Sequence, residues 1–341
     1  MVKGQRAGVW RRRFNAMRLW FDAGMVEFDP EASEVKRVDW LRTLPFVLVH
    51  VACLLVFVVG WSPIAVAVAV LLYAVRMFAI TGFYHRYFSH RSFKTSRFAQ
   101  FLFAVLGAAS VQRGPIWWAA HHRHHHAESE QADDPHSPVQ HGFLWSHTGW
   151  FLSRSHFGIR PERVADLMRF PELKLLDRFD ILVPVLLAVG LLWLGNYLES
   201  AAPQLGTSGG QMLIWGFFVS TVVLYHATFT INSLAHRWGR RRYATSDESR
   251  NNFWLALLTL GEGWHNNHHH YPASARQGFY WWEIDLTWYG LRLLALFGVV
   301  WDLKPVPSSR RDSGKIVAAD RSEEHTSELQ SPCNLVCRLL L

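Results

Sequence analysis

The chain has 341 residues, of which 50% are hydrophobic and 18% are charged, and its formal net charge is +8. This composition is too apolar for an ordinary soluble domain and too charged for membrane helices alone, so it predicts membrane helices joined to a polar catalytic region. The positive charge does not indicate a nucleic-acid partner, because the cations lie mostly at the ends of apolar runs.

Cysteine usage limits the redox chemistry that the chain can carry by itself. The three cysteines form no CxxC pair. The sequence therefore supports neither a disulfide framework nor a cysteine-ligated iron–sulfur centre. If the protein catalyses a redox reaction, we expect its electrons to come from another protein.

Residues 1–40 form a basic arm. The stretch from Arg11 to Phe21 mixes cations with apolar side chains. This pattern is typical of a helix that lies on an anionic membrane surface. A solvated terminus without regular structure is the alternative.

Four apolar runs approach the roughly 20 residues that a helix needs to cross a bilayer. They cover residues 44–60, 63–81, 181–197 and 212–231. The short loop within each pair of runs carries no Lys or Arg, whereas the N-terminal arm and the segments outside the pairs are rich in them. By the positive-inside rule, both termini and the polar region between the pairs are cytoplasmic.

Two further apolar segments, 98–111 and 291–300, are too short to span a bilayer. We expect them to lie at the interface or beside the catalytic region. Residues 41–303 would then form one membrane domain, followed by a polar tail over 304–320. Residues 321–341 differ in kind, because their first part resembles the translation of a short-read sequencing adapter. We interpret this last segment as a read-through artefact, with a genuine tail as the alternative.

Three clusters of histidines lie in the predicted cytoplasmic regions. Two clusters place histidines at i, i+3 and i+4, which puts them on one face of a helix. A pair five residues apart and a further Asn-Ser-Leu-Ala-His element complete the set. The clusters comprise His85 and His90; His122, His125 and His126; Asn232 and His236; and His265, His268 and His269. Imidazole binds iron, copper, zinc and nickel, and so many ligands exceed the need of one zinc ion. The hypothesis is a two-metal site gathered from distant segments.

Helical phase places a condition on the first pair. Five residues turn an α-helix through a full turn plus about 140°, so His85 and His90 cannot face one metal from a regular helix. The helix is therefore predicted to end or unwind between them. Asn232 and His236, in contrast, are one turn apart on one face.

These motifs resemble the histidine boxes of the integral-membrane fatty acyl desaturases, the stearoyl-CoA desaturase-like family. His85 and His90 match the first box, H-x4-H, and His122 begins the second, H-x2-HH. The N-S-x-x-H element and the third box follow in the family's order, and the resemblance covers about residues 40–300. It implies an all-α polytopic membrane protein with a cytoplasmic helical cap that carries the metal site.

The resemblance also implies a non-haem centre of two iron ions held by nine histidines. One iron would take His85, His90, His122, His126 and His268, and the other His125, His236, His265 and His269, with Asn232 holding a bound water. Carboxylates commonly orient ligand rings. The candidates for that role are Glu128, Asp133, Asp134, Asp285 and Glu262, of which Glu262 has a purely structural role as its alternative.

The activity implied by the resemblance is oxygen-dependent desaturation of a saturated acyl chain, with O2 as co-substrate. The product would carry a cis double bond, usually at carbon 9. Electrons would come from a ferredoxin, rubredoxin or cytochrome-type donor. Two alternatives stay open: a membrane diiron hydroxylase of fatty acids or alkanes, and a non-catalytic membrane metal-binding protein.

The substrate path and the acyl carrier are less defined. Tyr73, Met77 and Thr81 form one i, i+4 stripe that leads to the first histidine cluster. We expect this stripe to line the acyl chain, with helix packing as the alternative. Arg154 matches a cationic contact of the acyl-CoA enzymes, but Ala120 and His121 replace the Arg-Asp pair that contacts coenzyme A in them. The carrier could therefore be coenzyme A, a phospholipid or acyl carrier protein.

Overall fold

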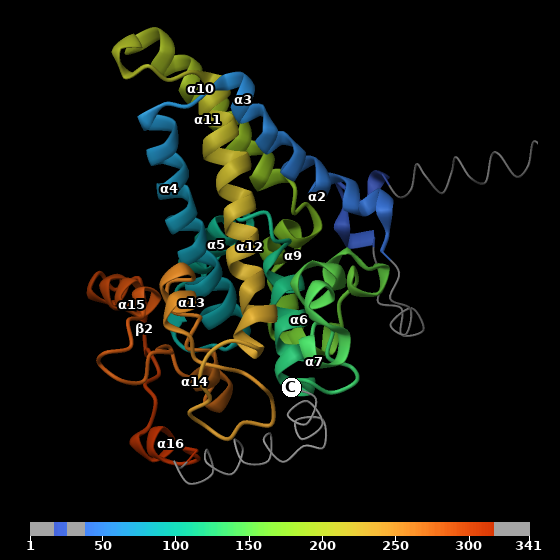
Figure 1. The fold of residues 1–341 in the computed structure, drawn as a ribbon, viewed down its shortest axis with the longest axis vertical. Coiled ribbons are helices and arrows are strands. Elements are labelled where there is room, and N and C mark those ends of the chain that lie inside the picture. Colours follow the sequence, from blue (N-terminus) through green and yellow to red (C-terminus); the bar gives the residue numbers. More distant parts are fainter. Residues whose placement is uncertain (1–16, 26–37, 317–341) are drawn as a thin grey trace, which may run out of the picture.

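The computed structural model describes residues 17–25 and 38–316 (Figure 1). Most of the predicted basic arm and the adapter-like segment lie outside these ranges. The described residues are mainly helical, with one two-stranded sheet, so the prediction of an all-α fold is confirmed. In that sheet β1 (Lys94–Thr95) pairs antiparallel with β2 (Val300–Trp301).

Three helical segments are long and apolar enough to cross a membrane: Pro63–Ser89, Leu182–Ala201 and Gly209–His236. They coincide with three of the four predicted spans. The first consists of α4 (Pro63–Phe78) and the π-helix η4 (Ala79–Ser89), and the second is α10 (Leu182–Ala201). The third consists of α11 (Gly209–Leu213), η10 (Ile214–Val219), α12 (Ser220–Ser233) and η11 (Leu234–His236).

The remaining predicted span, 44–60, is helical in the structure but is interrupted by a 3-10 turn. It consists of α2 (Trp40–Ala52), the 3-10 turn η3 (Cys53–Leu55) and α3 (Val56–Val59). Its apolar helix, Thr43–Val59, is below the length of a full span. Pro45 inside α2 removes one backbone donor. The crossing of this segment therefore stays a prediction.

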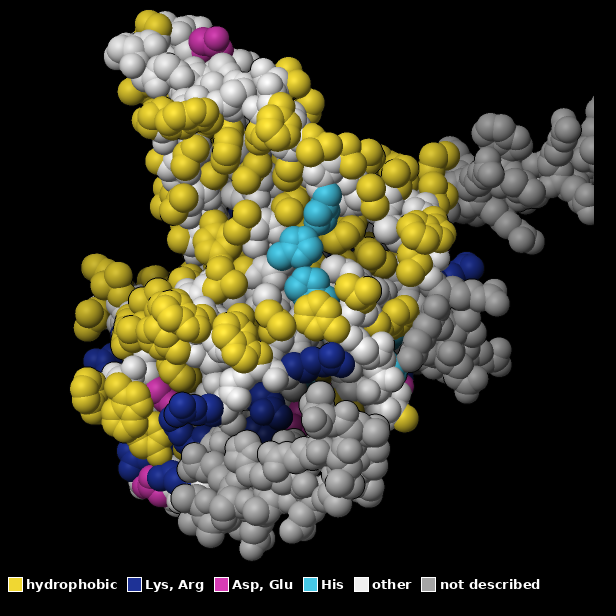
Figure 2. All heavy atoms as spheres, in the orientation of Figure 1, with side chains coloured by type: hydrophobic (Ala, Val, Ile, Leu, Met, Phe, Trp, Pro, Cys, Tyr) yellow, Lys and Arg dark blue, Asp and Glu magenta, His cyan; other side chains and the backbone are white. Residues whose placement is uncertain are grey.

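The long helices stand as a bundle above a broader cap (Figure 1). Hydrophobic side chains cover the visible face of the bundle, whereas cationic side chains gather on the cap (Figure 2). Large apolar residues such as Phe57 and Leu71 are 86% and 61% exposed on the bundle. Because water would disfavour so much exposed apolar surface, these faces are suited to contact lipid.

Short helices and loops build the cap. Its elements are α5 (Arg97–Ala108), α6 (Pro115–Glu128), α7 (Pro138–His141), η5 (Trp145–Gly149), η6 (Trp150–Leu152), η7 (Arg154–His156), η8 (Pro161–Val164), α8 (Ala165–Met168), α9 (Pro171–Arg178), α13 (Phe253–Leu258), α14 (His265–His270), α15 (Leu286–Leu296) and α16 (Ser308–Asp312). The turns η1 (Ala23–Met25) and η9 (Pro203–Leu205) lie outside it. The segment over 98–111 is thus the short helix that its sequence predicts.

The main core joins the lower end of the first span to α5 and α6. Phe83 of η4 stacks on Phe103 of α5 with ring centroids 3.7 Å apart. The first turn of α6 is capped by Asp177 of α9, whose carboxylate accepts the N–H groups of Ile116 and Trp117 at 3.0 and 2.8 Å. The Asp177 contacts and the aromatic core hold α6 against η4. Each of these two helices carries one of the histidine clusters.

Candidate metal centre

Histidines from four segments meet where the bundle joins the cap. They come from the end of η4, from α6, from η11 and from α14. Their ring nitrogens form two groups in which all ligand atoms lie within 4.8 Å of one another. The five-histidine group contains His85, His90, His122, His126 and His268, and the four-histidine group contains His125, His236, His265 and His269. These are the two sets that the family resemblance implies.

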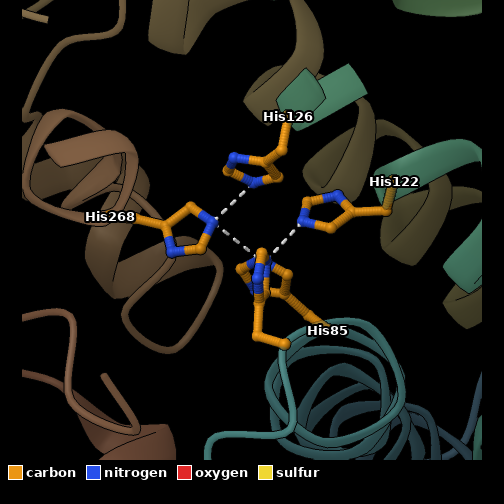
Figure 3. Close-up of side chains that lie close together, drawn as sticks. His85, His122, His126 and His268 are labelled. Carbon is orange, nitrogen blue, oxygen red and sulfur yellow. Dashed lines mark hydrogen bonds between the residues drawn. The ribbon is translucent and has the colours of Figure 1, made fainter. Parts of the chain in front are cut away.

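Figure 3 shows four members of the five-histidine group, His85, His122, His126 and His268, with their rings turned toward one another. The Nε2 atom of His268 lies 3.1 Å from that of His85 and 2.9 Å from that of His126. The Nε2 atom of His90 lies 2.8 Å from that of His122. A neutral imidazole has one lone pair and one N–H, so five rings that turn Nε2 inward bring together more lone pairs than hydrogen bonds can satisfy. A shared cation would satisfy them.

The four-histidine group is also suited to a metal ion, because one of its inward-facing nitrogens has no hydrogen-bond partner within the described part of the chain. The Nε2 atoms of His236 and His265 are 3.0 Å apart. The Nε2 atom of His269 is buried without a hydrogen-bond partner among the described residues. Buried polar atoms are normally paired, so this nitrogen fits a role as a metal ligand. The donor set therefore suits metal ions at both groups.

The π-helix η4 explains how His85 and His90 reach one group. The N–H of His90 bonds the carbonyl of His85 at 3.2 Å, which is the i→i+5 bond of a π-helix. Residues five apart then lie on the same face, instead of about 140° apart as in an α-helix. The expected break is thus a widening of the helix.

Three carboxylates bind the outer nitrogens of the four-histidine group. Asp134 lies 3.1 Å from Nδ1 of His125, and Glu130 lies 3.0 Å from Nδ1 of His236. Asp247 lies 2.5 Å from Nδ1 of His269. Each carboxylate accepts a hydrogen bond from the Nδ1–H group of its histidine. The Nε2 atom of that ring then has its lone pair free for a metal.

The five-histidine group has one such carboxylate. Glu262 lies 2.5 Å from Nδ1 of His85 and also contacts Arg86 at 3.0 Å and Gln277 at 2.7 Å. Glu262 is 5% exposed, so its charge interacts with little screening by water. The contact with His85 therefore favours a role for Glu262 in orienting a ligand ring over a purely structural role.

Sequence reasoning found some of these carboxylates and missed others. Asp134 and Glu262 were candidates and contact ligand rings. Glu128, Asp133 and Asp285 instead pair with Arg163, Arg160 and Arg86. Glu130 and Asp247 were missed, because they lie in loops and no helical spacing links them to the histidines that they contact.

The surroundings set the protonation of the centre. Burial holds the pKa values of His122, His126 and His268 well below their ordinary value, so these rings are neutral at neutral pH, as ligands must be. Burial alone would raise the pKa of Asp247, but its contact with His269 outweighs that effect and holds the pKa well below the ordinary value. Asp247 is therefore ionised.

Two adjacent cavities adjoin the histidines. The small cavity, of about 50 Å³, lies between the two groups and is lined by residues of both, including His122 and His265. The large cavity, of about 440 Å³, extends toward α2 and the start of α10. The two cavities share Trp118, His122, Thr228 and Asn232 as lining residues. A long apolar molecule could thus pass the metal groups and end in the small cavity.

The predicted substrate residues have different positions. Met77 and Thr81 line the small cavity. Tyr73 does not, and its hydroxyl donates to the carbonyl of Leu258 at 2.6 Å. Arg154 is exposed and lines neither cavity. Asn232 lines both cavities beside the four-histidine group, where a bound water would lie.

Three further histidines form a row outside the centre. Nε2 of His50 lies 3.1 Å from His226, whose Nδ1 lies 3.0 Å from His147. Histidine side chains are visible among hydrophobic ones on this face (Figure 2). Their ring nitrogens bond one another, Ser233 and the carbonyl of Phe46, so the row joins α2 to α12 and η5, as expected for packing residues.

Comparison with known proteins decides the family. The family model "Fatty acid desaturase" matches residues 60–301. The chain belongs to the fatty acid desaturase family. It is 38% identical over 276 residues to an sn-1 stearoyl-lipid 9-desaturase of Anabaena variabilis, which covers 80% of this chain and 96% of the relative.

Two other relatives are named for a lipid carrier and for coenzyme A, respectively. A Delta-9 acyl-lipid desaturase of Arabidopsis thaliana is 38% identical over 281 residues, 81% of this chain and 87% of its own length. An acyl-CoA 5-desaturase of Anemone leveillei is 37% identical over 294 residues, 82% and 86% of the two chains. This membrane desaturase is therefore an oxidoreductase that introduces a double bond into an acyl chain, as its sequence motifs predict.

Proposed function

We propose that the two histidine groups hold a pair of iron ions, and that the enzyme uses O2 to place a cis double bond at carbon 9 of a lipid-bound acyl chain. The observation that carries the proposal is the convergence of nine histidines into two groups beside an apolar cavity. When bound, the iron pair would supply the oxidation: a –CH2–CH2– unit, O2, two electrons and two protons give –CH=CH– and two waters.

The imidazoles would bind the irons directly, and the carboxylates would hold the imidazoles in position. Five rings would face one iron and four rings the other, with one carboxylate on the outer nitrogens of the first group and three on those of the second. Outer carboxylates orient the rings and raise their basicity. Asn232 would hold a water at the second iron, as the family pattern implies.

The cavities would determine which carbon reacts. An unactivated methylene has no polar group by which it can be recognised, so its position depends on the shape of the walls around the chain. Trp118 and Thr228 line the passage between the cavities, and Met77 lies at the inner end. The same walls exclude water from the reacting carbons. The carbon-9 position is supported by the relatives' names.

The electron donor and the orientation follow from sequence patterns. The chain has no iron–sulfur motif, so a ferredoxin, rubredoxin or cytochrome-type donor would bring electrons to the cap. The positive-inside rule places the cap, the centre and both termini on the cytoplasmic side of the cell membrane.

Product analysis of the full chain tests the proposal. We would express it in a desaturase-deficient host under 18O2 and analyse lipid fatty acids by mass spectrometry. A desaturase yields products two hydrogens lighter without 18O. Products that keep 18O would identify a hydroxylase, and iron-loaded protein without oxygen-dependent products would leave only a metal-binding role.

A further inference from the structure

A strained loop lies in the wall of the large cavity, between α5 and α6. Val111 and Arg113 have φ angles of 60° and 69°, although neither is glycine. A β-branched residue in the left-handed region is a genuine outlier. Such strain persists where the surroundings over-determine it, and it is common at binding sites.

Three hydrogen bonds hold this loop. The hydroxyl of Tyr225 donates to the carbonyl of Val111 at 2.7 Å, and that of Tyr84 donates to the carbonyl of Arg113 at 3.4 Å. Between them, the side-chain amide of Gln112 donates to Thr228 at 3.1 Å. Because membrane helices supply all three partners, the loop keeps its strained shape and holds Arg113 at the cavity.

Arg113 and Asp180 are the only Lys, Arg, Asp or Glu residues among the described residues that line the large cavity. Nε of Arg113 lies 2.9 Å from the Asp180 carboxylate, and the guanidinium lies 5.2 Å from the ring centre of Trp117. The Arg113 side chain is 27% exposed. An ion pair at the edge of an apolar cavity suits a ligand that has one polar end and one apolar end.

The pair lies near the membrane-facing part of the protein. Asp180 comes just before α10, and α10 and α2 contribute Pro184, Leu48 and Val49 to the cavity wall. Leu48 is 52% exposed on the outer face of α2. The polar end of a lipid in the adjoining leaflet can therefore reach the pair while its acyl chain enters the cavity.

We propose that Arg113 binds an ester carbonyl, and Asp180 a head-group hydroxyl, of a membrane glycerolipid whose acyl chain occupies the large cavity, an inference that rests on the proposed function. The guanidinium donates to an ester carbonyl, and the carboxylate accepts from a hydroxyl. One cation already paired with a carboxylate is a poor match for coenzyme A, whose phosphates call for several cations.

The position of the pair also fits the reaction at carbon 9. Arg113 lies in the loop before α6, and His122 lies on α6 seven residues after Pro115, which is a rise of about 10 Å along the helix at 1.5 Å per residue. A zigzag chain from carbon 1 to carbon 9 has eight bonds of about 1.5 Å and covers on the order of 10 Å. By holding the ester in one place, this subsite would determine which carbon of the acyl chain lies beside the histidine groups.

The test compares variants of the full chain in vesicles of 1-stearoyl phosphatidylglycerol, with stearoyl-CoA as a second substrate. For Arg113→Met we expect about a tenfold higher KM for the lipid, with little change in kcat and iron content. Double bonds should also spread to neighbouring carbons. Asp180→Asn should give a smaller rise, and Arg113→Lys an intermediate one. Arg97→Gln, which removes a surface ion pair with Glu172, should match wild type.

Retention of stearoyl phosphatidylglycerol in native mass spectrometry measures binding independently of turnover. Wild type that binds the lipid more tightly than Arg113→Met supports the subsite even if no product forms, in which case only the proposed function fails. Wild-type KM, lipid retention and double-bond position in both Arg113→Met and Asp180→Asn would overturn the inference. So would a preference of wild type for stearoyl-CoA.

Discussion

Because one carboxylate contacts the five-histidine group and three contact the four-histidine group, we expect the proposed pair of iron ions to be held unequally. Asp247→Asn removes a buried negative charge from Nδ1 of His269, while the residue keeps its size. Asp247 is 4% exposed and ionised, so water does not screen this charge. Loss of such an outer partner typically costs 10–100-fold in metal affinity, which corresponds to about 1.4–2.7 kcal/mol.

The assay is a chelator titration with iron measured by mass spectrometry. For Asp247→Asn we expect one of the two irons to leave at a chelator concentration about 10–100 times lower than in wild type, while the other iron leaves at the wild-type midpoint. Asp166→Asn is the control, because Asp166 binds Arg91 and Arg123 but no ligand ring. Wild-type retention of both irons by Asp247→Asn would refute the reasoning.

Three further predictions concern other parts of the molecule. Met77→Ala should enlarge the small cavity and lengthen the acyl chains accepted, as seen in product profiles, whereas Tyr73→Phe should not; unchanged chain lengths in Met77→Ala would contradict this. Burial raises the pKa of Asp177 to about 6, so its contribution to stability is full below pH about 4 and is lost as pH rises through about 6, a change of about 3 kcal/mol. Asp177→Asn should remove this part of the pH dependence of thermal unfolding, and a pH profile parallel to wild type would speak against it. Removal of iron by a chelator should lower the unfolding temperature, because metal binding stabilises the folded state; an unchanged temperature would argue against bound metal.

The sequence was sufficient to predict the ligand histidines because their spacing is a local property of helices. His122, His125 and His126 share a face whatever surrounds them, and so do Asn232 and His236. Length and hydropathy likewise located three membrane helices. These features depend on neighbours along the chain.

Features that depend on tertiary contacts could not be predicted. Glu130 reaches His236 across 106 positions of sequence, and Asp247 reaches His269 from a loop. Tyr73 continues the stripe of Met77 but bonds Leu258 instead of lining a cavity. The widening of the helix at His85 was visible only as a conflict between spacing and geometry, which several local structures could have resolved.

The segment Pro63–Ser89 is both a membrane span and, at its lower end, part of the metal centre. Most spans adapt to a thicker or thinner bilayer by tilting or sliding. Movement of this segment relative to its neighbours would displace His85 and His90 from their partners, so the lipids around it are expected to stretch or compress instead. Desaturated chains make a bilayer thinner and softer, and the enzyme's own product therefore changes the mechanical load on the helix that holds its ligands.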